Sequence, residues 1–196
     1  MPPAWDQMAP APDDDGDASG HPTWEGIAGA VRVMPLRRRH LRSVVAIEEA
    51  CYPRPWSATV FLSELAQRSS RRYRVATIGP LVVGFSGLMI VEEDGHITNI
   101  AVDPAWHRRS IGTVLLLDQA RAAPALGVRH LTLEVRVSNT PAQTLYQHFG
   151  FAPVGVRRNY YVETGEDAIV MWARDIDSDD YAGRLTEIEA RLRAGP

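Results

Sequence analysis

The spacing of apolar residues switches between helical and strand-like periods from residue 31 onward. It predicts the following elements in order: a strand at 31–35, helices at 40–51 and 58–67, strands at 72–77, 82–92 and 96–102, a helix at 111–123, a strand at 130–135, a helix at 141–148, and strands at 151–161 and 167–176. The order βααβββαβαββ is typical of a mixed sheet with helices on both faces. We therefore predict one α/β (α+β) domain over residues 31–176.

Residue types at the ends of these elements support the assignment. Ser57 and Asn139 each stand just before a predicted helix, where a side-chain oxygen can accept a hydrogen bond from the first turn. Gly150 follows the helix over 141–148 and is expected to stop it. The dipeptide Asp94-Gly95 predicts a tight hairpin turn between two neighbouring strands.

The two ends of the chain differ from the domain. Residues 1–30, with "APDDDGDASG" at their centre, lack apolar periodicity and are predicted to be a disordered tail. Residues 177–196 are predicted to contain a helix with one apolar side, which docks either on the domain or on a partner. Its apolar residues are Tyr181, Leu185, Ile188 and Leu192. Either tail offers a place for a protein partner.

Composition excludes several classes of protein. No apolar run is long enough to cross a membrane, and the N-terminus is acidic and proline-rich, unlike a secretory signal. The single cysteine, Cys51, rules out an internal disulfide framework and favours the cytoplasm; we expect it to be a small buried side chain near a helix end. The six histidines show no metal-ligand spacing, so no metal is expected.

Charge is unevenly distributed along the chain. Residues 1–30 hold six of the 24 acidic residues and no basic one, which leaves 18 acidic residues against 21 arginines in residues 31–196. This excess of three positive charges is too small to predict direct binding of nucleic acid.

The stretch "AWHRRSIGTVLL" (105–116) has the character of a phosphate-binding loop. It leads from a strand into a helix, whose first N–H groups are unpaired and carry partial positive charge, and it contains two arginines and a glycine. Taken alone, the same pattern fits an ordinary solvated helix start.

Three longer segments carry a resemblance to a known family. "NIAVDPAWHRRSIGTVLL", "LEVRVSNTPAQTLYQHFGF" and "RRNYY…EDAIVM" resemble the GNAT acetyltransferase superfamily, and within it the RimI-type enzymes that acetylate the N-terminal alanine of a small-subunit ribosomal protein. The likeness covers about residues 31–175 and includes "PWSATVF". It implies a mixed, mostly antiparallel sheet in which two parallel strands splay apart, with acetyl-CoA as co-substrate in the opening.

The resemblance also implies the residues that hold acetyl-CoA. The backbone of Ile100, Ala101 and Val102 would pair with the pantetheine arm, and residues 108–113 would wrap the pyrophosphate. The wrapping residues are Arg108, Arg109, Ser110, Ile111, Gly112 and Thr113. His107 and Ser110 depart from the family pattern, which has Gln or Arg at the first position and Gly at the second. If the backbone at Ser110 has a positive φ, the departure costs about 1 kcal/mol or more.

Three further residues take roles from the resemblance. Without it, Glu134 fits a solvated or salt-bridged strand position and Tyr146 fits core packing. With it, Glu134 is expected to be the general base, directly or through a water, and Tyr146 the general acid that protonates the departing thiolate. Asn139 would contact the cofactor arm besides capping its helix.

The acceptor amine is expected to lie between "YPRPW" (52–56) and "RRNYY" (157–161). The side chains of Pro55, Trp56, Tyr160 and Tyr161 would clamp an extended peptide, although packing roles are the alternative. Arg157 and Arg158 are either solvated or attract an acidic peptide. The expected activity is acetylation of the N-terminal alanine of a ribosomal protein. The alternatives are another protein N-terminus, a lysine, a small-molecule amine, or a non-catalytic acyl-CoA-binding scaffold.

Overall fold

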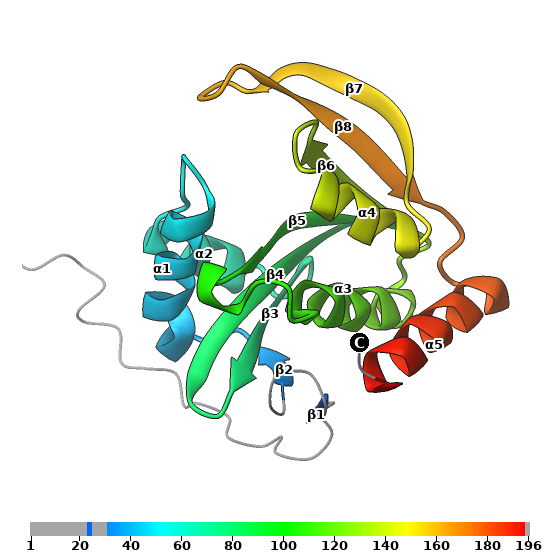
Figure 1. Cartoon of the computed structure of the whole chain (residues 1–196), viewed down its shortest axis with the longest axis horizontal. Helices are drawn as coiled ribbons and strands as arrows, with labels where there is room; N and C mark the ends of the chain where they lie inside the picture. Colours follow the sequence, from blue (N-terminus) through cyan, green and yellow to red (C-terminus); the bar gives the residue numbers. More distant parts are fainter. Residues whose placement is uncertain (1–22, 25–30, 195–196) are drawn as a thin grey trace, which may run out of the picture.

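The computed structural model describes residues 23–24 and 31–194 (Figure 1). Its strands are β1 (Thr23–Trp24), β2 (Val31–Pro35), β3 (Arg71–Ile78), β4 (Leu81–Val91), β5 (Asp94–Val102), β6 (His130–Arg136), β7 (Ala152–Tyr161) and β8 (Glu166–Ala173). Its α-helices are α1 (Leu41–Cys51), α2 (Ala58–Ala66), α3 (Ile111–Ala122), α4 (Thr140–His148) and α5 (Asp179–Ala194). The predicted order of elements from residue 31 is confirmed, and short 3-10 turns occur at 38–40, 104–106 and 124–126.

The described strands form one sheet in the order β1-β2-β3-β4-β5-β6-β8-β7. Every neighbouring pair is antiparallel except β5 and β6. These two parallel strands pair only near their first residues, and His96 with Thr132 is the last residue pair between them. Beyond that pair the two strands separate, which confirms the expected mixed sheet with a splayed parallel pair.

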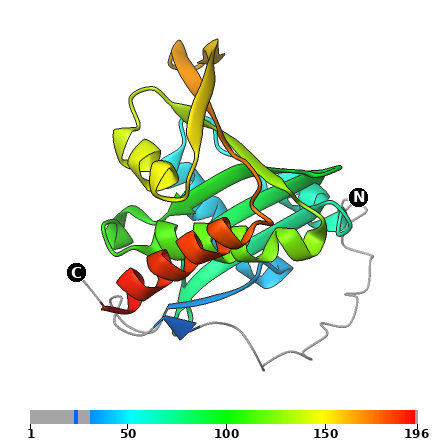
Figure 2. The same ribbon diagram turned by 90° about the vertical axis from the view of Figure 1, so that its right-hand side faces the viewer.

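Helices cover both faces of the sheet (Figures 1 and 2). Helices α3 and α5 pack on one face, where Leu115 and Leu116 of α3 join the larger core. Helices α1 and α2 pack on the other face around Phe61, which is fully buried. Successive residues of β3 therefore serve different cores: Val75 faces α1 and α2, and Ala76 faces α3.

Helix α5 lies against α3 (Figure 2). All four apolar residues predicted to form its one-sided face are buried in the core on that side of the sheet. The apolar face of this helix is thus covered by the chain's own domain and is not available to a partner.

The structure differs from the sequence prediction at the hairpin between β4 and β5. The predicted turn at Asp94-Gly95 is wrong: the turn is formed by Glu92 and Glu93, and Glu92 has a φ of 56°. Gly95 lies within β5, where an added Cβ would stand 2.9 Å from side-chain atoms of both Leu131 and Val128. Close packing, and not a turn, therefore requires glycine at this position.

The N-terminal tail is largely outside the described residues, and its predicted disorder stays a prediction. Within it, however, Thr23 and Trp24 pair with Arg32 and Val31 of β2. These two residues extend the sheet by a short edge strand that the absence of apolar periodicity did not predict.

Candidate active site

An irregularity in β5 shapes the centre of the site. The register with β4 pairs Gly87 with Asn99 and Leu88 with Ile97, so Thr98 is an extra residue in β5. A Cβ on Gly87 would lie only 2.4 Å from the ring of Tyr73 and 2.5 Å from the Thr98 hydroxyl. The glycine therefore permits the bulge, and Thr98 donates a hydrogen bond to Asn99 Oδ1 at 2.9 Å.

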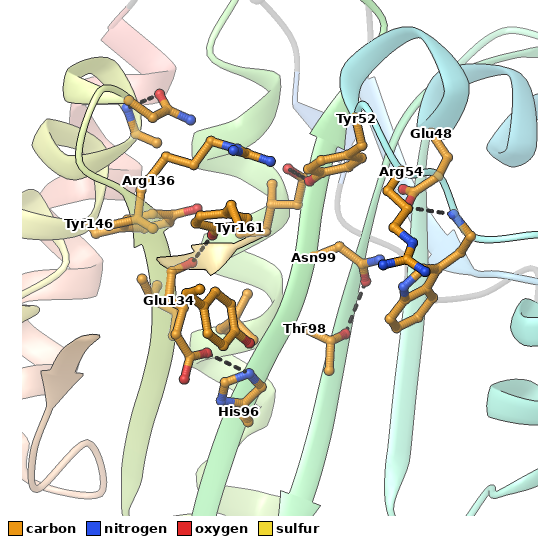
Figure 3. A pocket seen from close by; sticks show the side chains of 18 of the residues that line it. Glu48, Tyr52, Arg54, His96, Thr98, Asn99, Glu134, Arg136, Tyr146 and Tyr161 are labelled. Carbon is orange, nitrogen blue, oxygen red and sulfur yellow. Dashed lines mark hydrogen bonds and ion pairs between the residues drawn. The ribbon is translucent and has the colours of Figure 1, made fainter. Parts of the chain in front are cut away.

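A cavity of about 480 Å³ lies where β5 and β6 separate (Figure 3). Seven of the predicted site residues line it: Trp56, Ile100, Glu134, Asn139, Tyr146, Tyr160 and Tyr161. Tyr52 and Arg54, from the segment 52–56 expected to border the acceptor, also line it. Six further polar residues for which no role was predicted line it as well: Glu48, His96, Thr98, Asn99, Arg136 and Glu163. The cavity thus joins the ends of β5 and β6 to the α1–α2 connection and to β7.

Glu134 projects from β6 on the side opposite the apolar core. Its neighbours Leu133 and Val135 point into that core. The Glu134 side chain is only 7% exposed, and it contacts His96 (Nε2 to Oε2, 3.1 Å) and forms an ion pair with Arg157 (Nη1 to Oε1, 3.2 Å). The hydrogen bond from His96 is the main cause that lowers the pKa of Glu134, followed by the charges of His96 and Arg157, while burial acts in the opposite direction. Glu134 is therefore ionised at neutral pH.

Tyr146 and Asn139 reach the cavity from α4. The Asn139 side chain accepts a hydrogen bond from the Ala142 N–H at 3.2 Å, so the predicted N-cap is confirmed. Burial, and to a smaller extent Tyr161, raises the pKa of Tyr146, which keeps its hydroxyl protonated. That hydroxyl makes no hydrogen bond to another described residue, and it is free to donate to a bound molecule.

The two tyrosines at the end of β7 form one wall of the cavity. The rings of Tyr160 and Tyr161 meet at 90° with their centroids 5.1 Å apart. The Tyr161 hydroxyl donates to the Glu134 carbonyl oxygen at 3.4 Å, and the guanidinium of Arg136 lies 3.7 Å from the centroid of the Tyr161 ring. Arg136 is itself fixed by Glu163 and Glu166. This wall is held by several polar contacts across β6, β7 and β8.

The opposite wall carries a buried carboxyl group. Glu48 of α1 is 3% exposed; its Oε1 accepts a hydrogen bond from the Trp56 N–H at 3.2 Å, and its Oε2 has no hydrogen-bond partner in the part of the chain that the structure describes. Burial raises the pKa of Glu48 to about 7, and the hydrogen bond from Trp56 opposes that rise. The Trp56 ring packs against Phe61 with centroids 5.6 Å apart. Trp56 therefore has the packing role considered as its alternative and also borders the cavity.

The loop before α3 has the geometry of an anion-binding site. Ser110 precedes the helix with φ 56° and ψ 11°, and Arg108 also has a positive φ of 60°. Ser110 makes no side-chain cap, and the first turn of α3 contains no acidic residue to neutralise its N–H groups. Arg109 lies over the Trp106 ring at 4.9 Å. These features fit a pyrophosphate, and the positive φ at Ser110 is the costly case that the sequence analysis identified.

Two carbonyl groups near the end of β5, those of Ile100 and Val102, are already in contact with side chains. The Tyr52 hydroxyl donates to the Ile100 oxygen at 3.1 Å, and the Cys51 thiol donates to the Val102 oxygen at 3.3 Å. His107 also reaches the Val102 oxygen, at 2.8 Å. The end of α1 and the loop before α3 are therefore both fastened to the strand that would pair with the pantetheine arm.

Several predicted site residues do not line the cavity. Pro55 is exposed and outside it, and the side chains of Ala101 and Ile111 are buried in the two cores, so these two offer only backbone groups to a ligand. Val102, the last residue of β5, does not line the cavity either, and neither do the remaining predicted residues in the loop before α3 and in its first turn: Arg108, Arg109, Ser110, Gly112 and Thr113. Arg157 is not a free cation, because it pairs with Glu134.

Two features of the sequence could have identified cavity residues for which no role was predicted. Glu48 is an acid at the helical spacing of the buried residues of α1. His96 and Thr98 are polar residues on one side of a strand whose intervening residues are buried. Among the residues that the structure describes, no three His, Cys, Asp or Glu side chains are placed to hold a metal ion. No helix in the described part of the chain is long and apolar enough to cross a membrane.

Comparison with known proteins agrees with this geometry. The sequence profile of the Acetyltransferase (GNAT) family matches residues 41–151. A Bacillus subtilis (strain 168) protein, provisionally named a ribosomal protein bS18-alanine N-acetyltransferase, is 39% identical over 140 residues, which are 71% of this chain and 93% of the relative. The ribosomal protein bS18-alanine N-acetyltransferase of Escherichia coli (strain K12) is 34% identical over 141 residues, covering 71% and 94% of the two chains.

A solved structure of an N-acetyltransferase also resembles this chain. The crystal structure of the ribosomal-protein-S18-alanine N-acetyltransferase from Escherichia coli superposes with a TM-score of 0.68 at 32% identity, covering 74% of this chain and 94% of that one. The family profile spans the splayed strands and the loop before α3. The chain belongs to the GNAT acetyltransferase family and is an N-acetyltransferase that uses acetyl-CoA.

Proposed function

We propose that the protein transfers the acetyl group of acetyl-CoA to the N-terminal alanine of a small-subunit ribosomal protein, in the cytoplasm. The observation that carries the proposal is the convergence of Glu134, Asn139 and Tyr146 on one cavity at the point where β5 and β6 separate. The Bacillus subtilis and Escherichia coli relatives, each more than 30% identical along almost its whole length, are named for alanine N-acetylation of ribosomal protein bS18.

The chain's own residues suit direct transfer without an enzyme nucleophile. The loop of residues 108–113 would hold the pyrophosphate, and Asn139 would contact the cofactor arm. The acceptor amine attacks the thioester carbonyl carbon; a C–N bond forms and the C–S bond breaks. Glu134, ionised and nearly buried, provides the base for the amine proton, and Tyr146 donates its hydroxyl proton to the departing thiolate.

The chemistry favours a protein N-terminus over lysine. An α-amine has a pKa of about 7.7–8.0 and is roughly one-tenth to one-fifth neutral at pH 7, whereas a lysine side chain with a pKa near 10.4 is neutral only at about 0.04%. A single base is therefore sufficient for the α-amine. Tyr160 and Tyr161 on one wall of the cavity and Trp56 on the other would contact an extended peptide that binds between them.

The acceptor is tested with a set of peptides that differ only in their first residue. Mass spectrometry after incubation with acetyl-CoA should show the fastest acetylation when alanine is first. Equal rates for all first residues would indicate a broader N-terminal acetyltransferase. Modification of a lysine or of a free small amine in preference to any peptide N-terminus would contradict the proposal.

A further inference from the structure

Strand β2 leads directly into the start of α1 (Figure 1), and a group of exposed arginines lies at this point. Arg38, Arg39 and Arg42 are exposed, and we call these three residues the arginine patch. No acidic residue occurs in the segment 36–47 that contains them. None of the three forms an ion pair with another residue of the described part of the chain. Within that part, the positive charge of the patch is therefore not balanced by a paired carboxylate.

The positive charges at this point affect a neighbouring side chain. Burial lowers the pKa of His40, and the charges of Arg39 and Arg37 lower it further. Like charges this close repel one another, and an anion bound among them would relieve the repulsion. The arginine patch therefore favours an anionic partner.

The pairing of β1 with β2 gives the direction in which the chain approaches the patch. Thr23 lies opposite Arg32 and Trp24 lies opposite Val31, so the two strands are antiparallel. The chain that precedes Thr23 therefore enters β1 from the Pro35 end of β2. The arginine patch begins at that same end, three residues after Pro35.

The sequence that precedes Thr23 carries the matching charge. Its acidic run, residues 13–17 with the sequence "DDDGD", ends six residues before Thr23. Six residues of extended chain span up to about 20 Å, whereas β2 covers only about 10 Å from Arg32 to Pro35. The acidic run is therefore close enough along the chain to contact the patch. A covalent tether of this kind gives an effective concentration on the order of millimolar.

We propose that the arginine patch is the docking surface for the acidic run of the same chain. The four carboxylates of the run would cover arginines that otherwise attract the phosphates of RNA, and an external polyanion would have to compete with a tethered segment. The patch lies at the opposite end of α1 from Glu48 and Tyr52, which line the cavity. Docking therefore leaves the cavity open, and the inference does not depend on the proposed function.

The composition of the chain permits a direct test of this contact. The sequence contains no lysine, so Arg38→Lys and Arg42→Lys each place a single side-chain amine in the full-length protein while keeping the positive charge. A carbodiimide joins an amine to a carboxylate that contacts it, and mass spectrometry of the digested protein locates the link. Arg174→Lys is the matched control: Arg174 is exposed and follows β8, which four strands of the sheet separate from β2.

Both patch variants should give links to residues 13–17 within one molecule at 0.01 M salt, and Arg174→Lys should give none to this run. The links should be lost at 1 M salt, where the screening length falls from about 30 Å to about 3 Å. The absence of such links from both patch variants, or links that join only two molecules, would overturn the proposal.

Binding of a 20-nucleotide single-stranded RNA measures whether the run covers the patch. A run that occupies the patch for about nine-tenths of the time weakens a competitor about tenfold. Replacing all four aspartates of the run by asparagine should therefore tighten RNA binding about tenfold at 0.15 M salt, and adding Arg38→Gln and Arg42→Gln should remove the gain. Equal RNA affinity of the wild-type and asparagine chains would overturn the proposal, because the patch would then be open to an external polyanion. Acetyl transfer to a short peptide is measured in parallel, so that a failure of docking and a failure of the proposed function are distinguished.

Discussion

Replacing Ser110 by glycine should stabilise the protein, because Ser110 holds a left-handed backbone and gains nothing for it. Its φ is 56°, and its side chain forms no cap on α3. A residue with a Cβ pays roughly 1–2 kcal/mol for this conformation. Glycine loses more conformational entropy on folding than serine does, and this loss reduces the stabilisation by roughly 0.5–1 kcal/mol. The net gain in the free energy of unfolding is therefore about 0.5–1 kcal/mol.

Thermal unfolding gives a direct assay of this gain. A chain of this size gains roughly 2–4 °C in Tm per kcal/mol, so Ser110→Gly should raise Tm by about 1–4 °C. Since the loop already has the geometry that suits a pyrophosphate, the dissociation constant for acetyl-CoA should stay within about threefold of the wild-type value or become smaller.

Ser110→Ala is the control, because alanine has the same backbone cost and lacks only the hydroxyl. It should change neither Tm nor acetyl-CoA binding. A lower Tm in Ser110→Gly would refute the argument from backbone strain. Weaker acetyl-CoA binding in both variants would show that the serine hydroxyl itself contacts the ligand.

Three further substitutions test other parts of the account. Glu134→Gln should lower kcat about a hundredfold with little change in acetyl-CoA binding; calorimetric loss of binding would instead indicate a structural role. Tyr146→Phe should lower kcat by less, since a thiol is a fair leaving group, and a large rise in the dissociation constant for acetyl-CoA would contradict its role as acid. The pKa of Glu48 is about 7 in the folded protein against an ordinary 4.5, so the folded protein binds the Glu48 proton more tightly than the unfolded chain does. The free energy of unfolding should therefore fall by about 3 kcal/mol as the pH rises from 4.5 to 7. Urea titrations should show this fall in the wild-type protein and not in Glu48→Gln, and an equal fall in both would refute the assignment.

The order of elements was predictable because it depends on local periodicity. Strand β6 alternates buried and partly exposed residues, and Glu134 stands among the partly exposed ones. The caps at Ser57 and Asn139 followed from residue type at a helix start. The convergence of Glu134, Asn139 and Tyr146 came from the family resemblance, and the structure places all three around one cavity.

Contacts between distant segments could not be predicted from local pattern. Arg157 was expected to be solvated or to attract an acidic peptide, but it binds Glu134, 23 positions earlier in the chain, because β8 pairs with both strands and so places β7 one strand away from β6. The pairing of His96 with Glu134 depends on the register at which β5 and β6 meet. The turn predicted at Asp94-Gly95 was wrong because a glycine can be required by close packing as well as by a turn, and the sequence alone does not distinguish the two.

The central claim is transfer of an acetyl group to a protein α-amine in the cavity between β5 and β6. It is tested most directly with two peptides, one with a free N-terminal alanine and the other identical but with a blocked α-amine and a free lysine. The account predicts that the wild-type protein acetylates only the first peptide. Acetylation of the lysine peptide at a comparable rate, or of neither peptide while acetyl-CoA still binds, would contradict it.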